Sequence, residues 1–368
     1  MSAPGLLPNP LGGRLVVLAV VVVQVASAAL AAPPDTTDER QSRWAVLPIL
    51  FSSPDTGFGV GVLPQYVFRT APDARTSTLR ADLYYTQEGQ SNVTVRAGMW
   101  WPGNRYRLGG KAQVRDWPST YYGVGNTFAD SLRESFVERS AQVSVDLQRL
   151  VRPGVFAGVL AAFAHRTIRE REAGGVLARS ALAGSEGGEV LGAGVFLSFD
   201  TRDDVIYPTA GHLVRLDSRA YGRVAGADFG FTQHRLDARQ YVRLVGPFVL
   251  ALHGALRVST GAPPFQQLHG VGEVVRGYAS DRFADRHLLA FRAEVRVVPL
   301  VWRFGLAVFA GAGQVASGLG DFALDRFHVA YGAGLRFQII PSERVNVRWD
   351  FGFGDDSSGD YLDLGEAF

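Results

Sequence analysis

Two short stretches of this chain place charged side chains next to glycine, proline or tyrosine, a combination that can build a rigid polar site. The first stretch, residues 270–278, reads Gly-Val-Gly-Glu-Val-Val-Arg-Gly-Tyr. Its glycines permit a tightly folded chain that could hold the guanidinium of Arg276 in one place. An arginine held in this way forms charge-assisted hydrogen bonds with a carboxylate. A flexible surface loop is the alternative, and these residues alone leave both interpretations open.

The second stretch contains Asp200, Arg202 and Asp203, followed by Pro208 and Gly211. The three charged side chains can form a small ionic cluster that fixes the end of a strand. The proline and the glycine can then set the turn that begins the next strand. From these residues alone we expect a well-formed turn and no further role.

The chain shows no convincing catalytic motif. It lacks His-Glu-x-x-His, Gly-x-Ser-x-Gly and the phosphate-binding Gly-x-x-x-x-Gly-Lys pattern. Its 7 histidines are scattered, and the absence of cysteine excludes thiolate metal sites and disulfide bonds. Ser218 and His234 lie on neighbouring expected strands and could share a face as a lipid-hydrolysing dyad, although isolated polar residues near a membrane interface are the simpler explanation. We expect no catalytic residues, no metal and no cofactor.

The segments that would position these stretches alternate with a period of two. Residues 327–340 place Phe327, Val329 and Tyr331 on one face, and polar or small side chains on the other. Such segments run for about 10 to 14 residues, which is longer than the usual strand of about 5 or 6 residues. A soluble β-sandwich also alternates, but here the polar faces carry charges and glycines throughout. The pattern fits a transmembrane β-barrel with an apolar outer wall and a polar lumen.

We therefore expect an all-β fold, a 16-stranded antiparallel transmembrane β-barrel with both ends in the periplasm. Short turns then fall on the periplasmic side, and long loops at about 115–133, 171–186 and 261–286 fall outside. The expected strands are 44–51, 57–69, 76–87, 91–101, 105–114, 134–148, 154–170, 187–200, 211–223, 229–244, 248–260, 287–298, 303–315, 327–340, 343–354 and 358–368.

The N-terminal residues 1–31 have the features of a secretory signal peptide. Arg14 precedes a short apolar run, and small residues follow, with cleavage expected after Ala28 or Ala31. At about 1.5 Å per residue the run is too short to cross about 30 Å of hydrocarbon. Residues 32–43 form a short periplasmic leader, and the barrel then occupies residues 44–368 in the bacterial outer membrane.

The C-terminal residues 361–368 also alternate and end on Phe368. A terminal aromatic side chain on the lipid face is what the assembly machinery of the outer membrane commonly reads. We expect Phe368 on that face, at the end of the last strand.

The two charged stretches resemble motifs of BamA/TamA-like proteins, also called the bacterial surface antigen family. The first carries Val275-Arg276-Gly277-Tyr278 and precedes Phe291-Arg292-Ala293-Glu294-Val295-Arg296, and the second carries Asp200-Thr201-Arg202-Asp203 with Pro208 and Gly211. Residues 47–59 and 121–126 resemble the short members of the family. The resemblance implies a barrel of sixteen strands with the Arg-Gly loop between the eleventh and twelfth, which is where the count from alternation places it.

The resemblance also implies that the loop folds into the lumen and sets Arg276 against an acidic residue of the wall. In the family this residue is often an Asp in a Phe-x-Asp-x-Gly segment of strand thirteen, but this sequence has Gly311 there. We expect Glu294, on the polar face of strand twelve, to replace it.

The family opens between its first and last strands. Pro48 in the first strand cannot donate to a backbone ladder, and Gly365 and Phe368 belong to the last strand, so these three residues mark the expected seam. The glycines of the last two strands, 352, 354, 359 and 365, would either weaken this seam, or relieve crowding or bend the barrel wall.

The implied function is assistance in the insertion or translocation of polypeptides at the outer membrane. The expected partners are outer-membrane lipids, unfolded outer-membrane polypeptides and periplasmic accessory proteins, and not nucleic acid, because the arginines are spread along the chain. The short leader leaves no room for the N-terminal periplasmic domains of full assembly factors. A passive pore or structural barrel is the alternative, and a barrel lipid hydrolase is less favoured.

Overall fold

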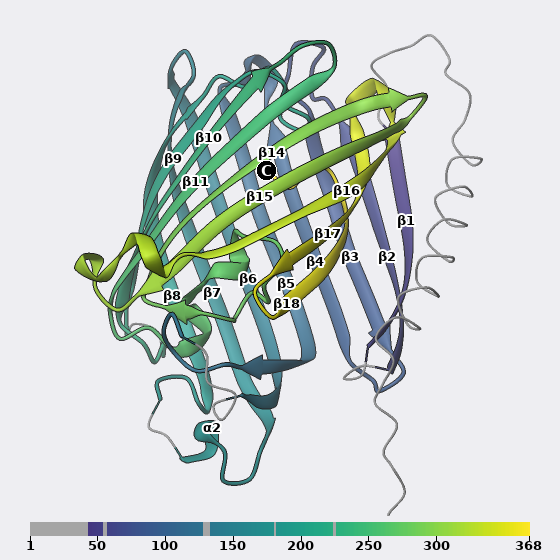
Figure 1. The fold of residues 1–368 in the computed structure, drawn as a ribbon. Helices are drawn as coiled ribbons and strands as arrows, with labels where there is room; N and C mark the ends of the chain where they lie inside the picture. The colour runs from purple at the N-terminus through teal and green to yellow at the C-terminus, as the bar shows by residue number, and fades with distance from the viewer. Residues whose placement is uncertain (1–42, 54–56, 128–132, 180–181, 224–225) are drawn as a thin grey trace, which may run out of the picture.

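The computed structural model describes residues 43–53, 57–127, 133–179, 182–223 and 226–368. The expected signal peptide, residues 1–31, and residues 32–42 of the expected leader lie outside this part of the chain. The described residues form one antiparallel sheet of 16 strands that curls into a barrel (Figure 1). None of the helices in the described ranges is long and apolar enough to span a membrane.

Each strand of the barrel pairs with the next one along the chain. The wall consists of β1 (Arg43–Ser53), β2 (Gly57–Phe68), β3 (Ser77–Thr86), β4 (Ser91–Trp100), β5 (Tyr106–Tyr121), β6 (Glu134–Arg152), β7 (Val155–Arg171), β8 (Gly187–Asp200), β9 (Gly211–Tyr221), β10 (Phe231–Arg243), β11 (Phe248–Gly261), β14 (His287–Val301), β15 (Phe304–Ala316), β16 (His328–Ile340), β17 (Val345–Gly354) and β18 (Ser357–Leu364).

The connections hold only short elements. The β11–β14 connection contains a small sheet, β12 (His269–Gly270) and β13 (Ala284–Asp285). The remaining elements are α2 (Val176–Arg179) and the 3₁₀ turns η1 (Pro102–Asn104), η3 (Phe265–Gln267), η4 (Val271–Glu273), η5 (Leu319–Asp321), η6 (Leu324–Arg326) and η7 (Pro341–Glu343).

The alternating side chains sort between the two faces of the wall. In β8, Val195 and Leu197 are exposed on the outside, whereas Phe196 and Ser198 are buried on the inside. An outer face that meets lipid takes apolar side chains, while the inner face can carry polar ones. This confirms the expected all-β barrel of sixteen strands, with an apolar outer wall and a polar lumen.

Strand β5 is longer than the sequence predicts. Residues 115–121 were expected in a loop, but Trp117 to Tyr121 continue the ladder opposite Glu138 to Glu134 of β6. The loop prediction is therefore wrong for these residues, because pairing with the long strand β6 extends the β5–β6 hairpin on the side of the long loops.

The two edge strands, β1 and β18, form no backbone ladder with each other in the described ranges. Instead, the inner faces of β1 and β2, with Leu47 and Leu63, pack against Val345 and Val347 of β17 and Leu364 of β18. Both valines belong to the outward face of β17, yet they are almost fully buried. The ends of the sheet therefore overlap, and apolar side chains close the seam.

The last four residues leave the wall. Strand β18 ends at Leu364, and Gly365 has a φ of 89°, a left-handed conformation that favours glycine. Phe368 is only 7% exposed, because its ring stacks on His253 inside the lumen, with ring centroids 5.5 Å apart. Figure 1 marks this end of the chain at the level of the strands, away from the barrel rims. The expectation of Phe368 on the lipid face is wrong, because the turn at Gly365 redirects the chain inward.

The side chain of Leu63 is fully buried between the overlapping ends of the sheet, so the stability of the barrel should depend on its volume. We expect Leu63→Ala to lower the free energy of unfolding by about 2–5 kcal/mol, because the lost methyl groups leave a cavity between two sheet ends. Leu63→Met conserves volume and should cost less than about 1.5 kcal/mol. Urea titration of the barrel in detergent micelles measures both changes. Equal stability of Leu63→Ala and the unmodified chain would contradict the overlap.

Candidate functional site

The β11–β14 connection, residues 262–286, folds into the lumen as a packed segment. Val271, Val274 and Val275 are buried against Leu288 of β14 and Val315 of β15. The apolar side chains between the glycines explain this packing, because they can be buried only against the wall. The first stretch is therefore a docked loop, and the flexible surface loop is excluded.

Glycines on both sides let the loop backbone touch the wall. Gly277 has a φ of 117°, and a Cβ at Gly352 of β17 would lie 2.8 Å from the Gly277 nitrogen. A Cβ at Gly354 would lie 2.4 Å from the ring of Tyr278, whose hydroxyl donates a hydrogen bond to the Val329 carbonyl at 2.7 Å. Gly352 and Gly354 thus make room for the loop. Of the roles expected for these two glycines, they relieve crowding and do not weaken the seam.

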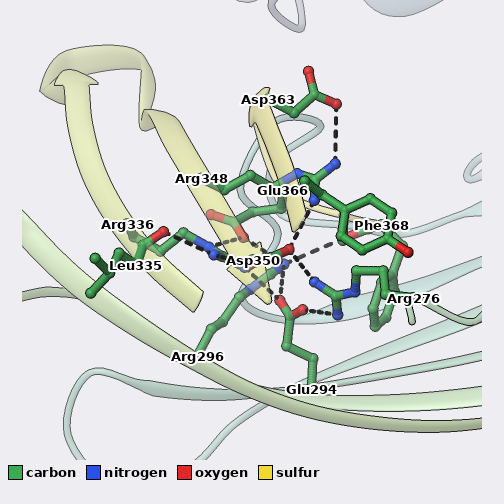
Figure 2. A network of polar contacts seen from close by, with 12 residues as sticks. Arg276, Glu294, Arg296, Leu335, Arg336, Arg348, Asp350, Asp363, Glu366 and Phe368 are labelled. Atoms are coloured by element: carbon green, nitrogen blue, oxygen red, sulfur yellow. Dashed lines mark hydrogen bonds and ion pairs between the residues drawn. The ribbon is translucent and has the colours of Figure 1, made fainter. Parts of the chain in front are cut away.

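Arg276 joins two buried carboxylates. Its Nη2 donates to Glu294 of β14 at 2.5 Å, and its Nη1 donates to Asp350 of β17 (Figure 2). Both acidic side chains are 0% exposed, so their charges depend on arginine partners. The guanidinium also lies 3.5 Å from the ring centroid of Phe309. The structure brings Arg276 to Glu294, as expected, and adds Asp350, which the sequence analysis missed.

Gly311 stands where the family often has an aspartate, but it leaves no empty space in the site. A Cβ at this glycine would lie 3.2 Å from Cγ1 of Val275, so the loop itself fills the space where an aspartate side chain would begin. Asp350 supplies the second carboxylate from β17, two strands farther along the sheet than Gly311 in β15.

The network extends from Asp350 through further arginines. Arg336 pairs with Asp350 at 2.5 Å and with Glu366 at 2.9 Å, while Arg348 pairs with Asp350 at 2.8 Å (Figure 2). Arg296 lies 3.8 Å from both Glu294 and Glu366. Four arginines and four acids form this charge network: Arg276, Arg296, Arg336, Arg348, Glu294, Asp350, Asp363 and Glu366.

The turn after β8 reaches the same network. Arg296 donates to the Pro208 carbonyl at 2.6 Å, and its guanidinium lies 4.7 Å from the ring centroid of Tyr207. Burial raises the pKa of Tyr207 to about 12, which keeps this phenol neutral beside the charges. The expectation of a turn with no further role is therefore wrong, because its carbonyl binds a lumen arginine. The sequence could not show this contact, since it uses a backbone atom.

The charged residues of this turn form two separate groups. Arg202 pairs with Asp200 at 2.9 Å, whereas Asp203 accepts hydrogen bonds from the hydroxyl and the backbone N–H of Thr209. Burial acts to raise the pKa of Asp203, but these bonds and one from the Ala210 N–H outweigh it and hold the pKa below its usual range. The single ionic cluster expected from the sequence is wrong, because Asp203 closes the turn instead.

Gly211 completes this turn. Its φ is 98°, and a Cβ there would lie 2.3 Å from the Thr201 carbonyl oxygen. Only glycine fits this close approach between the two ends of the turn.

The residues expected at the seam occupy different places. Pro48 lies on the exposed face of the edge strand β1, where a missing N–H is tolerated. Gly365 and Phe368 belong to the tail, residues 365–368, which the lumen holds through Arg292 and Arg296: their guanidinium groups donate to the carbonyls of Ala367 and Phe368 at 3.0 and 3.4 Å.

Two serine–histidine pairs bear on enzymatic function. Ser218 and His234 are register partners in β9 and β10, but the described structure contains no hydrogen bond between them. Ser259 of β11 does contact His269 of the loop at 3.0 Å, and Glu273 lies 3.8 Å from the same imidazole. Ser259 and His269 are each 1% exposed, so this contact attaches the loop to the wall and offers no surface to a substrate. The sequence analysis missed it.

Comparison with known proteins agrees with this geometry. The model of the Omp85 superfamily domain matches residues 75–353. The chain belongs to the Omp85 superfamily. This confirms the resemblance to BamA/TamA-like barrels, and the family places the chain in the bacterial outer membrane. No curated protein sequence matches the chain.

Solved structures of other Omp85 barrels share the fold. BamA from Haemophilus ducreyi lacking POTRA domains 1-3 is 14% identical, with a TM-score of 0.53 over 88% of this chain and 69% of that one. CdiB from Acinetobacter baumannii is 13% identical, with a TM-score of 0.54 over 88% and 59%. CdiB from Escherichia coli is 11% identical, with a TM-score of 0.56 over 87% and 61%. The chain thus spans less than two thirds of either CdiB chain.

The loop of this Omp85 barrel should depend on its buried carboxylates. We expect Arg276→Ala and Glu294→Ala to release the loop to a similar extent, and Asp350→Ala to release it most. Each acid pairs with three arginines, but two of the partners of Glu294 are 3.6 and 3.8 Å away, whereas all three partners of Asp350 lie within 2.8 Å. Breaking a buried pair costs about 3–5 kcal/mol. The rate of tryptic cleavage after Arg282 and Arg286 measures the release.

Glu186→Ala serves as the control, because this carboxylate is 81% exposed in its pair with Arg171. It should change the cleavage rate little, since an exposed pair contributes about 0–1 kcal/mol. Unchanged cleavage in Glu294→Ala would show that the pairing does not hold the loop.

Proposed function

We propose that this barrel assists the insertion or translocation of polypeptides at the outer membrane, and that the seam between β1 and β18 is the place where it opens. The observation that carries the proposal is the seam itself, because it is the one junction of the described wall without a backbone ladder. Unfolded outer-membrane polypeptides and periplasmic accessory proteins are the partners that this function requires. The Omp85 superfamily, with its insertion and translocation barrels, supports the same class of activity.

A seam closed by side chains opens at lower cost than a ladder. Separating two paired strands breaks a row of hydrogen bonds, each worth about 0.5–1.5 kcal/mol net and more where no water replaces it. Separating apolar faces such as those of Leu47 and Val347 costs less within a bilayer, because lipid tails are as apolar as the side chains that they replace. The seam therefore combines a closed resting state with easy opening.

Opening would expose two strand edges. An unpaired edge offers a row of N–H and C=O groups that can pair with an incoming strand. A polypeptide that enters as a strand could therefore satisfy its backbone on β1 or β18 while its side chains sort between lipid and lumen.

A polar contact inside the lumen fastens β18 while the seam is closed. Arg80 of β3 pairs with Asp363 and donates to the Leu364 carbonyl at 3.2 Å. Tyr361 of β18 accepts a hydrogen bond from the Gly277 N–H at 2.8 Å, which connects the strand to the docked loop. These contacts give β18 a defined resting position from which it can be released.

Cysteine pairs can test the seam, because the chain contains no native cysteine. One cysteine is introduced at position 45, 47 or 49 of β1 and a second at position 362 or 364 of β18. These positions pack in the same apolar cluster. Purified variants are reconstituted into liposomes, and the folding of a co-added outer-membrane protein is measured before and after oxidation. We expect oxidation across the seam to abolish assisted folding and reduction to restore it.

The matched control joins Leu50→Cys to Val60→Cys, which are register partners within the β1–β2 hairpin, lie outside the apolar cluster of the seam and do not span it. This cross-link should leave assisted folding intact. Unimpaired folding with a fully cross-linked seam would contradict the proposed opening. Ion conductance without any assisted folding would instead identify a passive pore.

A further inference from the structure

A second polar site lies in the lumen, apart from the charge network. A cavity of about 360 Å³ opens near the periplasmic ends of β3 to β5 and β8 to β10, where the turn after β8 forms part of its lining. Four arginines line it: Arg107, Arg202, Arg215 and Arg239. This volume lies in the range of small-molecule pockets, about 300–1,000 Å³.

The acids around this cavity are too few for its arginines. Asp200 is shared by Arg75 and Arg202, at 2.6 and 2.9 Å. Asp146 is shared by Arg107 and Arg215, at 3.2 and 3.9 Å. Arg215 also lies 3.8 Å from Asp217, which Arg219 shares at 2.8 Å. With Arg239, six positive charges therefore face three negative ones, which leaves an excess of three.

Arg239 is the lining arginine that shares none of these acids. No described acidic side chain lies within ion-pair distance of it, and its buried Nε has no hydrogen-bond partner among the described atoms. The neighbouring acids are already used, since Asp237 binds Arg257 at 2.5 Å and His253 at 2.8 Å. A guanidinium without a carboxylate in a partly enclosed lumen attracts an anion.

The other lining groups suit a phosphate. Thr78 and Ser198 bring hydroxyls to the cavity, and Gln148 brings an amide that can also donate. Arginine forks bind phosphate oxygens through two parallel hydrogen bonds, and hydroxyls can complete the remaining contacts. Trp100 forms an apolar wall on which Arg75 and Arg107 rest, with 5.0 and 5.9 Å from guanidinium carbon to ring centroid.

We infer that this cavity binds a small phosphate-bearing anion, either inorganic phosphate or a phosphorylated solute from the periplasm. The headgroup of a membrane lipid is disfavoured, because the strands of the wall separate the cavity from the bilayer. The inference does not depend on the proposed polypeptide function, since it uses different residues and a different ligand.

The test is a calorimetric titration of the folded barrel in detergent micelles. Inorganic phosphate and glycerol phosphate are titrated in parallel at constant ionic strength, with chloride as the balancing anion. We expect saturable binding of one or both, and Arg239→Gln should weaken it about tenfold or more, the effect of losing a charge-assisted hydrogen bond. Arg239→Lys should be intermediate, because it keeps the charge and loses the fork.

Arg152→Gln is the matched control, because this arginine is exposed at the periplasmic end of β6 and does not line the cavity. It should bind like the unmodified barrel. A short-chain phospholipid dispersed in the same micelles forms a third arm, and tighter binding of this lipid than of either solute would overturn the choice of ligand. No saturable binding to the unmodified barrel, or equal binding to a folded Arg239→Gln, would overturn the site.

Discussion

The structure depends on the placement of one arginine between two buried carboxylates. Glu294 and Asp350 are fully excluded from solvent, and neither would stay charged without Arg276 and its neighbours. Each of the four acids lies within ion-pair distance of at least two arginines, with Arg80 as a second partner of Asp363, so the network is specific in its geometry. It joins the docked loop, the turn after β8 and the C-terminal tail to β14, β16 and β17, which makes this side of the barrel a single rigid unit.

The opposite edge of the sheet is held differently. Strands β1 and β2 meet the other side mainly through apolar side chains. Two ion pairs also cross the overlap, one between Arg80 of β3 and Asp363 of β18, and one between Arg69, directly after β2, and Glu343 of η7. The two sides of the seam are therefore held by different kinds of contact, with buried ion pairs at β14, β16 and β17 and mainly apolar side chains at β1 and β2. The tail is consistent with this division. Residues 365–368 turn into the lumen, so β18, the strand that borders the seam, ends at Leu364. This contrast in bonding is the physical basis of the proposal that the barrel opens at the seam.

The number of strands, and the face of the wall on which each side chain lies, could be predicted from the sequence. Lipid on one side and a polar lumen on the other constrain alternate residues of every strand. The same alternation identified Glu294, because the neighbouring residues in the sequence show that it lies on the polar face of its strand. Asp350 could not be found in this way, because it lies 74 residues from Arg276 and the contact depends on the register of three intervening strand pairs. Phe368 was misplaced because alternation was continued through Gly365, where a left-handed residue ends the strand.

Hydrogen–deuterium exchange of the Arg276→Ala barrel tests most directly whether one network holds the rigid side together. The account predicts faster exchange in three segments that are distant in sequence: the loop 262–286, the turn 201–210 and the tail 365–368. Exchange in residues 143–150 of β6 and 156–163 of β7, which pair with each other, should stay unchanged, because these described segments form no hydrogen bond or ion pair with the charge network or the loop. An increase confined to the loop would contradict the account, since it would show that turn and tail are held independently of Arg276.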